Sequence, residues 1–396
     1  MDSSADKQDP SIDHDGFPAA VGRPPHDCGE IFRMFGQEYE RTHDMTAKQR
    51  QVLRAVASCR TTALGGHRTK CGSCGHEETS YNSCRDRHCP KCQGILARKW
   101  VEERKAELLP VPYFHLVFTT PDDLVDYLRM DARKFLNILF EAMSESLLKM
   151  FLEKHASIPL VTSILHTWGS SMILHPHLHC VVSGGGLSSD GVRWISTGGE
   201  YLLDVKELSK RFRDVFVRLL RKRFPKHPPQ KSVIEKDWVV FCKKPFAGAE
   251  KFVEYIGRYT HRAAISNSRI TDVAPERKTV TITYKDYKNA KTDGVPEIKT
   301  MTLSAMEFIG RFLSHVLPEG FRKIRFHGLA AGKKRAANLA LCRSIFGLPS
   351  LQEDEHETQE PKPCPVCGGK MILMDMHPPS GPPPIIFRNE TWRLTA

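Results

Sequence analysis

The chain has 396 residues, of which 40% are hydrophobic and 26% charged, with a formal net charge of +12. This composition fits a globular protein of two or three domains. No apolar run reaches the ~18–20 residues of a membrane span, and residues 1–25 lack a signal-peptide core. We therefore expect a cytoplasmic protein that contacts no membrane, and its positive charge favours a polyanionic partner.

The amino-terminal region predicts a disordered leader followed by two helices. Residues 1–28 are rich in Asp, Ser and Pro. From Glu30 to Cys59, apolar residues recur at helical spacing and form one face of each helix: Ile31, Phe32, Phe35 and Tyr39, then Val52, Leu53 and Val56.

Twelve cysteines in a chain of this kind indicate metal binding rather than disulfides. Cys71-x2-Cys74 and Cys89-x2-Cys92 are two close pairs, and two such pairs complete a tetrahedral four-thiolate zinc site. Five more cysteines and histidines lie nearby: Cys59, His67, His76, Cys84 and His88. Four of them could bind a second zinc ion, and the alternative is that the histidines are polar surface residues. The second-site set that we favour is Cys59, His67, Cys84 and His88, so we expect one or two structural zinc ions.

Basic residues accompany the cysteines. Arg85 and Arg87 lie between the two pairs and Lys91 lies within the second pair, so the zinc module is expected to contact DNA while the metal holds its fold. A third pair, Cys364-x2-Cys367, lies in an acidic and then proline-rich tail and forms half of a zinc ribbon. Its candidate partners are Cys342 and His377, and the alternative is a pair of free thiols.

Between these cysteine motifs, helical and strand patterns alternate. Helices are predicted at 97–109, 124–152, 205–224 and 305–316, and strands at 113–119, 160–166, 177–183, 238–242, 279–284 and 298–303. This order favours an α+β fold, an antiparallel sheet with packed helices. The basic helix 205–224 and the basic segment 321–346 are candidate DNA-contact surfaces, with a solvated helix face as the alternative for the first.

The motif His177-Leu178-His179 lies in one predicted strand. Side chains two apart on a strand point the same way, so both imidazoles lie on one face and suit a divalent metal. A third ligand must come from elsewhere in the fold. His115 and His166 are candidates from other predicted strands, and His261 is a further option.

Two tyrosines, Tyr255 and Tyr259, lie one turn apart on a short predicted helix. Arg258, His261 and Arg262 surround them, which suits phosphate better than a protein core, although tyrosines at this spacing often form a core stripe. A tyrosine hydroxyl can attack a phosphodiester that a metal polarises, and the tyrosine then keeps the 5′ phosphate covalently. We expect both tyrosines to be nucleophiles, with Mg²⁺ or Mn²⁺ at the histidines.

Together these motifs resemble the two-tyrosine HUH transposases of rolling-circle bacterial insertion sequences, which carry an N-terminal transposase zinc-binding domain. The resemblance includes segments 82–92, 166–169 and 257–262 and covers about residues 30–346. It implies the HUH endonuclease fold, whose central sheet carries the histidines and faces the tyrosine helix, behind a small ribbon-like zinc domain. It also implies recognition of the two ends of the element.

From the motifs and the resemblance we expect four regions: a leader (1–28), a helical entry with the zinc-binding domain (29–110), a catalytic domain (111–346) and a tail (347–396). The expected activity is nicking and joining of single-stranded DNA at insertion-sequence ends, without ATP, in the bacterial cytoplasm at the nucleoid. The alternatives are a rolling-circle replication initiator or relaxase, a non-catalytic zinc DNA-binding protein, and a metal-dependent phosphodiesterase that uses water.

Overall fold

The computed structural model describes residues 24–199, 201–243, 253–254, 256–257, 260–286, 296–351 and 363–380. The chain divides into two compact units: unit 1 is Met1–Leu96, Arg262–Val316 and Glu353–Arg393, and unit 2 is Ala97–His261, Leu317–Gln352 and Leu394–Ala396. The predicted domains are contiguous along the chain, whereas these units are not. Residues 262–316, which the prediction assigns to the catalytic domain, belong to unit 1, together with the described tail residues 363–380.

Unit 1 begins with a helical hairpin whose two helices start at capping boxes. The Asp27 side chain accepts from the Glu30 amide at the start of α1 (Cys28–Thr42), and the Thr46 side chain accepts from the Gln49 amide at the start of α2 (Ala47–Ser58). The apolar faces predicted for both helices are buried. The leader prediction ends too late, since α1 starts at Cys28, and its residues 1–23 lie outside the described ranges.

Two three-stranded antiparallel sheets complete unit 1. Their strand orders are β12-β1-β2 and β10-β9-β8. The bounds are β1 (Gly66–Cys71), β2 (Glu77–Tyr81), β8 (Ile270–Ala274), β9 (Thr279–Asp286), β10 (Glu297–Ser304) and β12 (Met371–His377), with short 3-10 turns at Thr62–Leu64 and Asn267–Arg269. The helix α9 (Ala305–Ser314) packs on the helical hairpin, where the rings of Phe32 and Phe312 meet edge to face at 5.1 Å. The strands predicted at 279–284 and 298–303 are confirmed as β9 and β10, which pair with each other.

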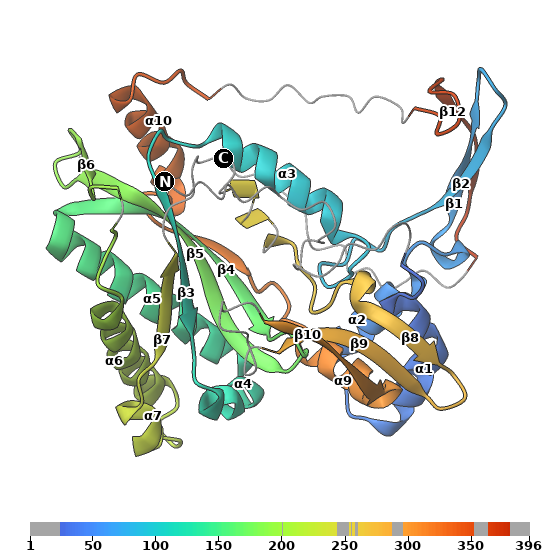
Figure 1. Ribbon diagram of the computed structural model, residues 1–396, viewed down its shortest axis with the longest axis horizontal. Helices are drawn as coiled ribbons and strands as arrows, with labels where there is room; N and C mark the ends of the chain where they lie inside the picture. The colour runs from blue at the N-terminus through green and yellow to red at the C-terminus, as the bar shows by residue number, and fades with distance from the viewer. Residues whose placement is uncertain are drawn as a thin grey trace. The chain divides into compact units, whose positions relative to one another are not determined.

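Unit 2 is built on a six-stranded sheet with the order β11-β4-β5-β3-β7, and β6 pairs with β5 (Figure 1). Every pairing in it is antiparallel. The bounds are β3 (Tyr113–Thr119), β4 (Ser157–Trp168), β5 (Leu174–Ser188), β6 (Trp194–Ser196), β7 (Val239–Lys243) and β11 (Ile324–Gly328). The α+β fold with an antiparallel sheet and packed helices is confirmed.

In the described part of unit 2, the helices with defined bounds are α3 (Gln93–Ala106, in this unit from Ala97), α4 (Val125–Met130), α5 (Ala132–His155), α6 (Val205–Arg223), α7 (Lys231–Glu235) and α10 (Arg335–Ile345), with 3-10 turns at Asp122–Leu124 and Gly332–Lys334. The predicted helix 124–152 is interrupted at Asp131, which caps α5 by accepting from the Lys134 amide. Among the described helices, none is both long enough and apolar enough to span a bilayer.

The helices α5 and α6 lie side by side against one face of the central sheet (Figure 1). Alternate residues of β3 and β5 enter the core on that face: Phe114, Leu116, Phe118, Leu178, Cys180 and Val182. Because side chains alternate along a strand, the intervening residues, including His115, His177 and His179, lie on the opposite face. We call that side of the sheet the histidine face.

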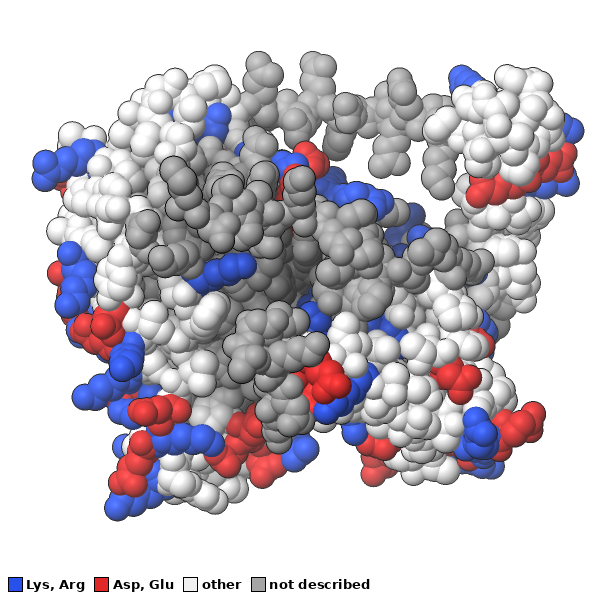
Figure 2. Space-filling view, viewed as in Figure 1, with Lys and Arg blue, Asp and Glu red and all other residues white. Residues whose placement is uncertain are grey.

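Part of the positive charge of the basic helix α6 is paired with α5. Three of its arginines pair with glutamates of that helix, in the pairs Arg211–Glu153, Arg218–Glu145 and Arg223–Glu141. Figure 2 shows the result at the lower left of the view, where Lys and Arg alternate with Asp and Glu. These acids compensate part of the charge of α6, as expected for a solvated face, while Lys206, Lys210, Arg221 and Lys222 are exposed.

The core assignment predicts different effects for two phenylalanines. Phe212 is fully buried on α6 and meets Phe118 at 5.1 Å, so Phe212→Ala should lower the free energy of unfolding by about 3–5 kcal/mol. Phe241 on β7 is 53% exposed, so Phe241→Ala should change it by less than about 0.5 kcal/mol. Urea unfolding followed by tryptophan fluorescence measures both. Equal losses at the two positions would contradict this core.

Candidate functional site: a histidine triad on the central sheet

Three histidines meet on the histidine face because of the register between β4 and β5. His166 pairs directly with His177, and Ile164 pairs with His179. Directly paired residues of an antiparallel ladder have Cβ atoms about 4.5–5.5 Å apart on the same face. The candidate ligand nitrogens of His166, His177 and His179 accordingly all lie within 4.8 Å of one another. We call these three residues the histidine triad.

Hydrogen bonds orient the triad for metal binding. The Nδ1 atom of His177 lies 2.7 Å from the backbone oxygen of His175, so it carries the proton and donates it. The lone pair of His177 is therefore on Nε2, which lies 3.1 Å from Nε2 of His179. Two nitrogens bound at right angles to one divalent ion are about 3 Å apart, so this separation fits a shared ligand sphere.

His115 contacts the triad from the other side of β5. It is on β3, diagonal to His179, and its Nε2 atom lies 2.9 Å from Nδ1 of His179. Burial, together with the charge of Lys243, lowers the pKa of His115 to about 4. A neutral His115 can accept the Nδ1 proton of His179, which leaves the Nε2 atom of His179 available to a metal.

Of the three candidates for a third ligand, His166 is the one that the structure groups with His177 and His179. His115 touches His179 from outside that group. His261 is half-buried, and its Nδ1 atom lies 2.9 Å from the Thr260 hydroxyl. Burial, together with the charge of Lys323, lowers the pKa of His261 to about 4.

The predicted nucleophiles Tyr255 and Tyr259, and the predicted phosphate contact Arg258, lie outside the described residues. Several of their sequence neighbours are described. Val253 and Ile256 are buried in a cluster with Tyr113 and with Ile164, which is two residues from His166 on β4. A Cβ added at Gly257 would lie 2.1 Å from the Val101 side chain of α3, so this position requires glycine.

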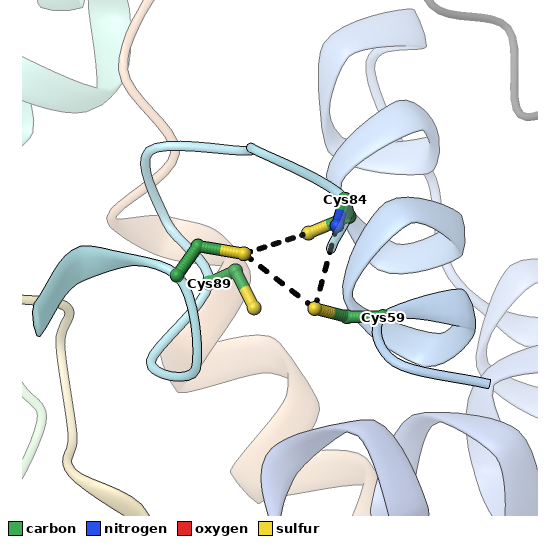
Figure 3. Close-up of side chains that lie close together, drawn as sticks. Cys59, Cys84 and Cys89 are labelled. Atoms are coloured by element: carbon green, nitrogen blue, oxygen red, sulfur yellow. Dashed lines mark hydrogen bonds between the residues drawn. The ribbon is translucent and has the colours of Figure 1, made fainter. Parts of the chain in front are cut away.

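A first cysteine cluster lies after α2 in unit 1. It consists of Cys59, Cys84, Cys89 and Cys92, whose sulfurs lie within 4.8 Å of one another. Figure 3 shows the sulfurs of Cys59, at the end of α2, and of Cys84 and Cys89, from the loop after β2, pointing toward one another. Hydrogen bonds with the neighbouring thiols, first of all that of Cys59, lower the pKa of Cys92. Four converging thiols suit a tetrahedral ion.

A second cysteine cluster joins distant parts of unit 1. It consists of Cys71, Cys74, Cys364 and Cys367, again with all sulfurs within 4.8 Å. The predicted grouping of Cys71 and Cys74 with Cys89 and Cys92 is therefore wrong, because β12 pairs with β1 and brings the tail pair to the first pair.

The other residues proposed as zinc ligands belong to neither cluster. His67 pairs with Ser80 and Met376 within its sheet, and the His88 ring contacts Asp86 at 2.9 Å. Cys342 lies in the core of unit 2. The option that His377 completes the tail site is also wrong, since its ring faces Asp375.

The predicted DNA-contact residues differ in their surroundings. Arg85 is exposed and Arg87 and Arg262 are half-buried. Lys91 lies 2.8 Å from Asp27, the residue that caps α1. Although burial alone would raise the pKa of Asp27, the hydrogen bond and charge of Lys91 hold it below the usual value. Lys91 therefore pairs with Asp27 within the protein, and Arg85 is more accessible than Lys91 as a candidate DNA contact.

Comparisons with known proteins agree with this geometry. The family descriptions "Putative transposase" and "Transposase zinc-binding domain" match residues 161–337 and 31–120. "Putative transposase y4qJ" of Sinorhizobium fredii is 38% identical over 399 residues, which span 92% of this chain and 98% of that protein. The transposase for insertion sequence element IS801 of Pseudomonas savastanoi pv. phaseolicola is 28% identical over 304 residues, which span 72% of this chain and 70% of that protein.

No solved structure matches the chain significantly. The match to the Sinorhizobium protein extends over nearly the whole of both chains, and the two family matches contain the histidine triad and the first cysteine cluster. The chain belongs to the two-tyrosine HUH transposases of rolling-circle bacterial insertion sequences, with an N-terminal transposase zinc-binding domain.

Proposed function

We propose that this transposase nicks and joins single-stranded DNA at the ends of its insertion sequence by metal-assisted tyrosine transesterification. The observation that carries the proposal is the convergence of His166, His177 and His179 on one sheet face. Val253 and Ile256, which flank Tyr255 in the sequence, pack against that same face beside Ile164. The candidate metal ligands and the described residues on either side of Tyr255 therefore lie on one face of the sheet, which supports the proposal.

The triad residues would hold Mg²⁺ or Mn²⁺, and their three imidazoles favour Mn²⁺ because nitrogen donors suit it better than Mg²⁺. A bound ion would polarise the scissile phosphodiester and neutralise charge that develops on its oxygens. The chain itself supplies orientation. The His175 carbonyl fixes the tautomer of His177, and His115 can fix that of His179, so both Nε2 lone pairs point to one place.

Tyr255 or Tyr259 supplies the nucleophile. The tyrosine oxygen forms a bond to phosphorus, the bond from phosphorus to the 3′ oxygen breaks, and the 3′ oxygen takes up the proton that the tyrosine loses. The product is a 5′-phosphotyrosine and a free 3′ hydroxyl. Because one phosphodiester replaces another, the reverse attack by a 3′ hydroxyl reseals or transfers the strand without ATP. The second tyrosine allows a second attack while the first adduct persists.

Recognition of the DNA ends falls to the zinc-binding domain and the residues around the tyrosines. Arg85 and Arg87 lie in the loop that contains the first cysteine cluster, and Arg258 and Arg262 flank Tyr259 in the sequence. Guanidinium groups bind phosphate oxygens and fix the register of a protein on DNA. With DNA as its substrate, the transposase is expected to work in the bacterial cytoplasm at the nucleoid.

The triad predicts a rank order among histidine substitutions. We expect His166→Ala and His177→Ala to abolish metal-dependent nicking and to leave DNA binding intact, because each removes a ligand. His115→Ala should weaken Mn²⁺ affinity by about 10–100-fold, since it removes only a group that orients a ligand, and added Mn²⁺ should restore nicking. Nicking of labelled single-stranded DNA across a Mn²⁺ titration measures both effects.

His175→Ala is the matched control, because it removes an imidazole from the same strand and keeps the carbonyl that His177 uses. It should nick like the wild-type protein. Nicking that persists in His177→Ala would contradict a metal at the triad. Rescue of His166→Ala by Mn²⁺, together with irreversible loss in His115→Ala, would exchange the roles assigned to these two residues.

The tyrosines predict a covalent adduct. Protein incubated with labelled single-stranded DNA from the flanks of its own gene and Mn²⁺ should carry the label on a denaturing gel, because the 5′ phosphate stays on the enzyme. Tyr255→Phe and Tyr259→Phe should each retain some label, and the double variant should retain none. Cleavage without an adduct in the wild-type protein would favour hydrolysis by water. Binding with neither product would favour a non-catalytic DNA-binding protein.

A further inference from the structure

The second cysteine cluster contains two residues outside both family matches. Those matches cover residues 31–120 and 161–337, whereas Cys364 and Cys367 follow them in the tail. The cluster joins residues 290 positions apart, Cys74 and Cys364. The strand β12, directly after the tail pair, runs antiparallel to β1, and its register pairs Met371 with Cys71.

The two cysteine pairs have the same local backbone. In the first loop the Cys71 amide donates to the His76 carbonyl at 2.8 Å, and the Gly75 amide donates to the Cys71 carbonyl at 3.0 Å. In the second, the Cys364 amide donates to the Gly369 carbonyl at 2.8 Å, and the Gly368 amide donates to the Cys364 carbonyl at 2.8 Å. The glycine after each pair has a positive φ, +76° at Gly75 and +73° at Gly368.

Both loops therefore form the same tight turn, which requires glycine directly after the second cysteine. The turn holds two sulfurs on one side of each loop. The Ser73 amide also points at the Cys71 sulfur at 3.4 Å.

The sulfur separations fit a metal rather than disulfides. Cys71 and Cys367 have sulfurs 3.5 Å apart, and Cys74 and Cys364 have sulfurs 3.6 Å apart. A disulfide bond is about 2.05 Å long. Sulfurs at 2.3 Å from a central zinc in a tetrahedron are about 3.8 Å apart. The four sulfurs thus lie close to the corners of a zinc tetrathiolate.

The sheet around this cluster has almost no apolar core of its own. Its buried cluster consists of Cys71, Cys364 and Met371. In β12, Ile372, Leu373, Met374 and Met376 are each at least half exposed. So small a core does not supply the stability that a folded sheet needs, and small modules of this kind depend on a structural metal.

We propose that Cys71, Cys74, Cys364 and Cys367 bind a second structural zinc ion and form a zinc ribbon whose two halves come from opposite ends of the chain. The ion ties the tail to the zinc-binding domain, and β12 forms its third strand only when the ion is bound. The tail is thereby a structural part of unit 1. This inference does not depend on the chemistry proposed for the histidine triad.

Metal content of the full-length protein tests the proposal. After dialysis against metal-free buffer, the wild-type protein should contain two zinc ions per chain by mass spectrometry of metals. The double variant Cys364→Ser/Cys367→Ser should contain one. Cys242→Ser, which alters a thiol of unit 2 outside both clusters, should still contain two. A double variant with an unchanged zinc content, or a wild-type protein with iron in place of zinc, would overturn the proposal.

A spectroscopic measurement covers the case in which the variant folds poorly. In wild-type protein loaded with Co²⁺, absorption from cobalt thiolate should correspond to two four-sulfur sites, and the double variant should lose about half of it. Limited proteolysis should release the tail from the double variant and from chelator-treated protein before the rest is cut. Two results together would contradict the ribbon. The wild-type protein would show the absorption of only one four-sulfur site, and the tail would resist proteolysis equally in the wild-type protein and the double variant.

Discussion

The register between β4 and β5 is the constraint on which the candidate site depends. It sets His166 opposite His177 and Ile164 opposite His179. A slip by one residue would turn every side chain of a strand to the other face and would bury the histidines in the α5/α6 core. Two features oppose such a slip: Leu165 and Leu178 fill that core, and a Cβ at Gly186 would meet the Ile158 carbonyl at 2.4 Å.

This register gives the two faces of the sheet different roles: one face packs the core, and the other carries the histidines. The α5/α6 face is packed with aromatic and aliphatic side chains, which makes the strands rigid. The histidine face carries three candidate metal ligands. Neighbouring acceptors can fix the tautomers of two of them, the His175 carbonyl for His177 and the His115 ring for His179. A rigid sheet that holds preoriented ligands suits a reaction in which alignment of phosphorus with its nucleophile accounts for much of the rate.

Local patterns predicted most of the elements, and non-local pairing accounts for what they missed. The shared face of His177 and His179 follows from the two-residue period of a strand, and the helix 205–224 from its apolar stripe. The choice of His166 over His115 needed the register of the two strands beside β5, which sets His166 opposite His177 but His115 opposite Val181, and no local pattern contains it. The nucleophile region cannot be compared in this way, because Tyr255 and Tyr259 lie outside the described residues.

The cysteines show the same limit. The sequence groups Cys71 and Cys74 with Cys89 and Cys92 because they are near neighbours, yet β1 pairs with β12 and selects Cys364 and Cys367. A glycine follows both Cys74 and Cys367, and this repeated signal could have linked the two loops in advance. The assignment of residues 262–316 to unit 1 likewise depends on the packing of α9 against α1. The residues in contact there, such as Phe32 and Phe312, are far apart in the sequence.

The proposed reaction attaches a tyrosine of this chain covalently to the 5′ phosphate of nicked DNA. Peptide mapping by mass spectrometry, after nicking in Mn²⁺ and digestion of the DNA to its last nucleotide, detects such a bond. We expect a single nucleotide, attached through its 5′ phosphate, on a peptide that contains Tyr255 or Tyr259. A nucleotide attached to a peptide without either tyrosine, or nicked DNA with no modified peptide, would contradict the proposed reaction.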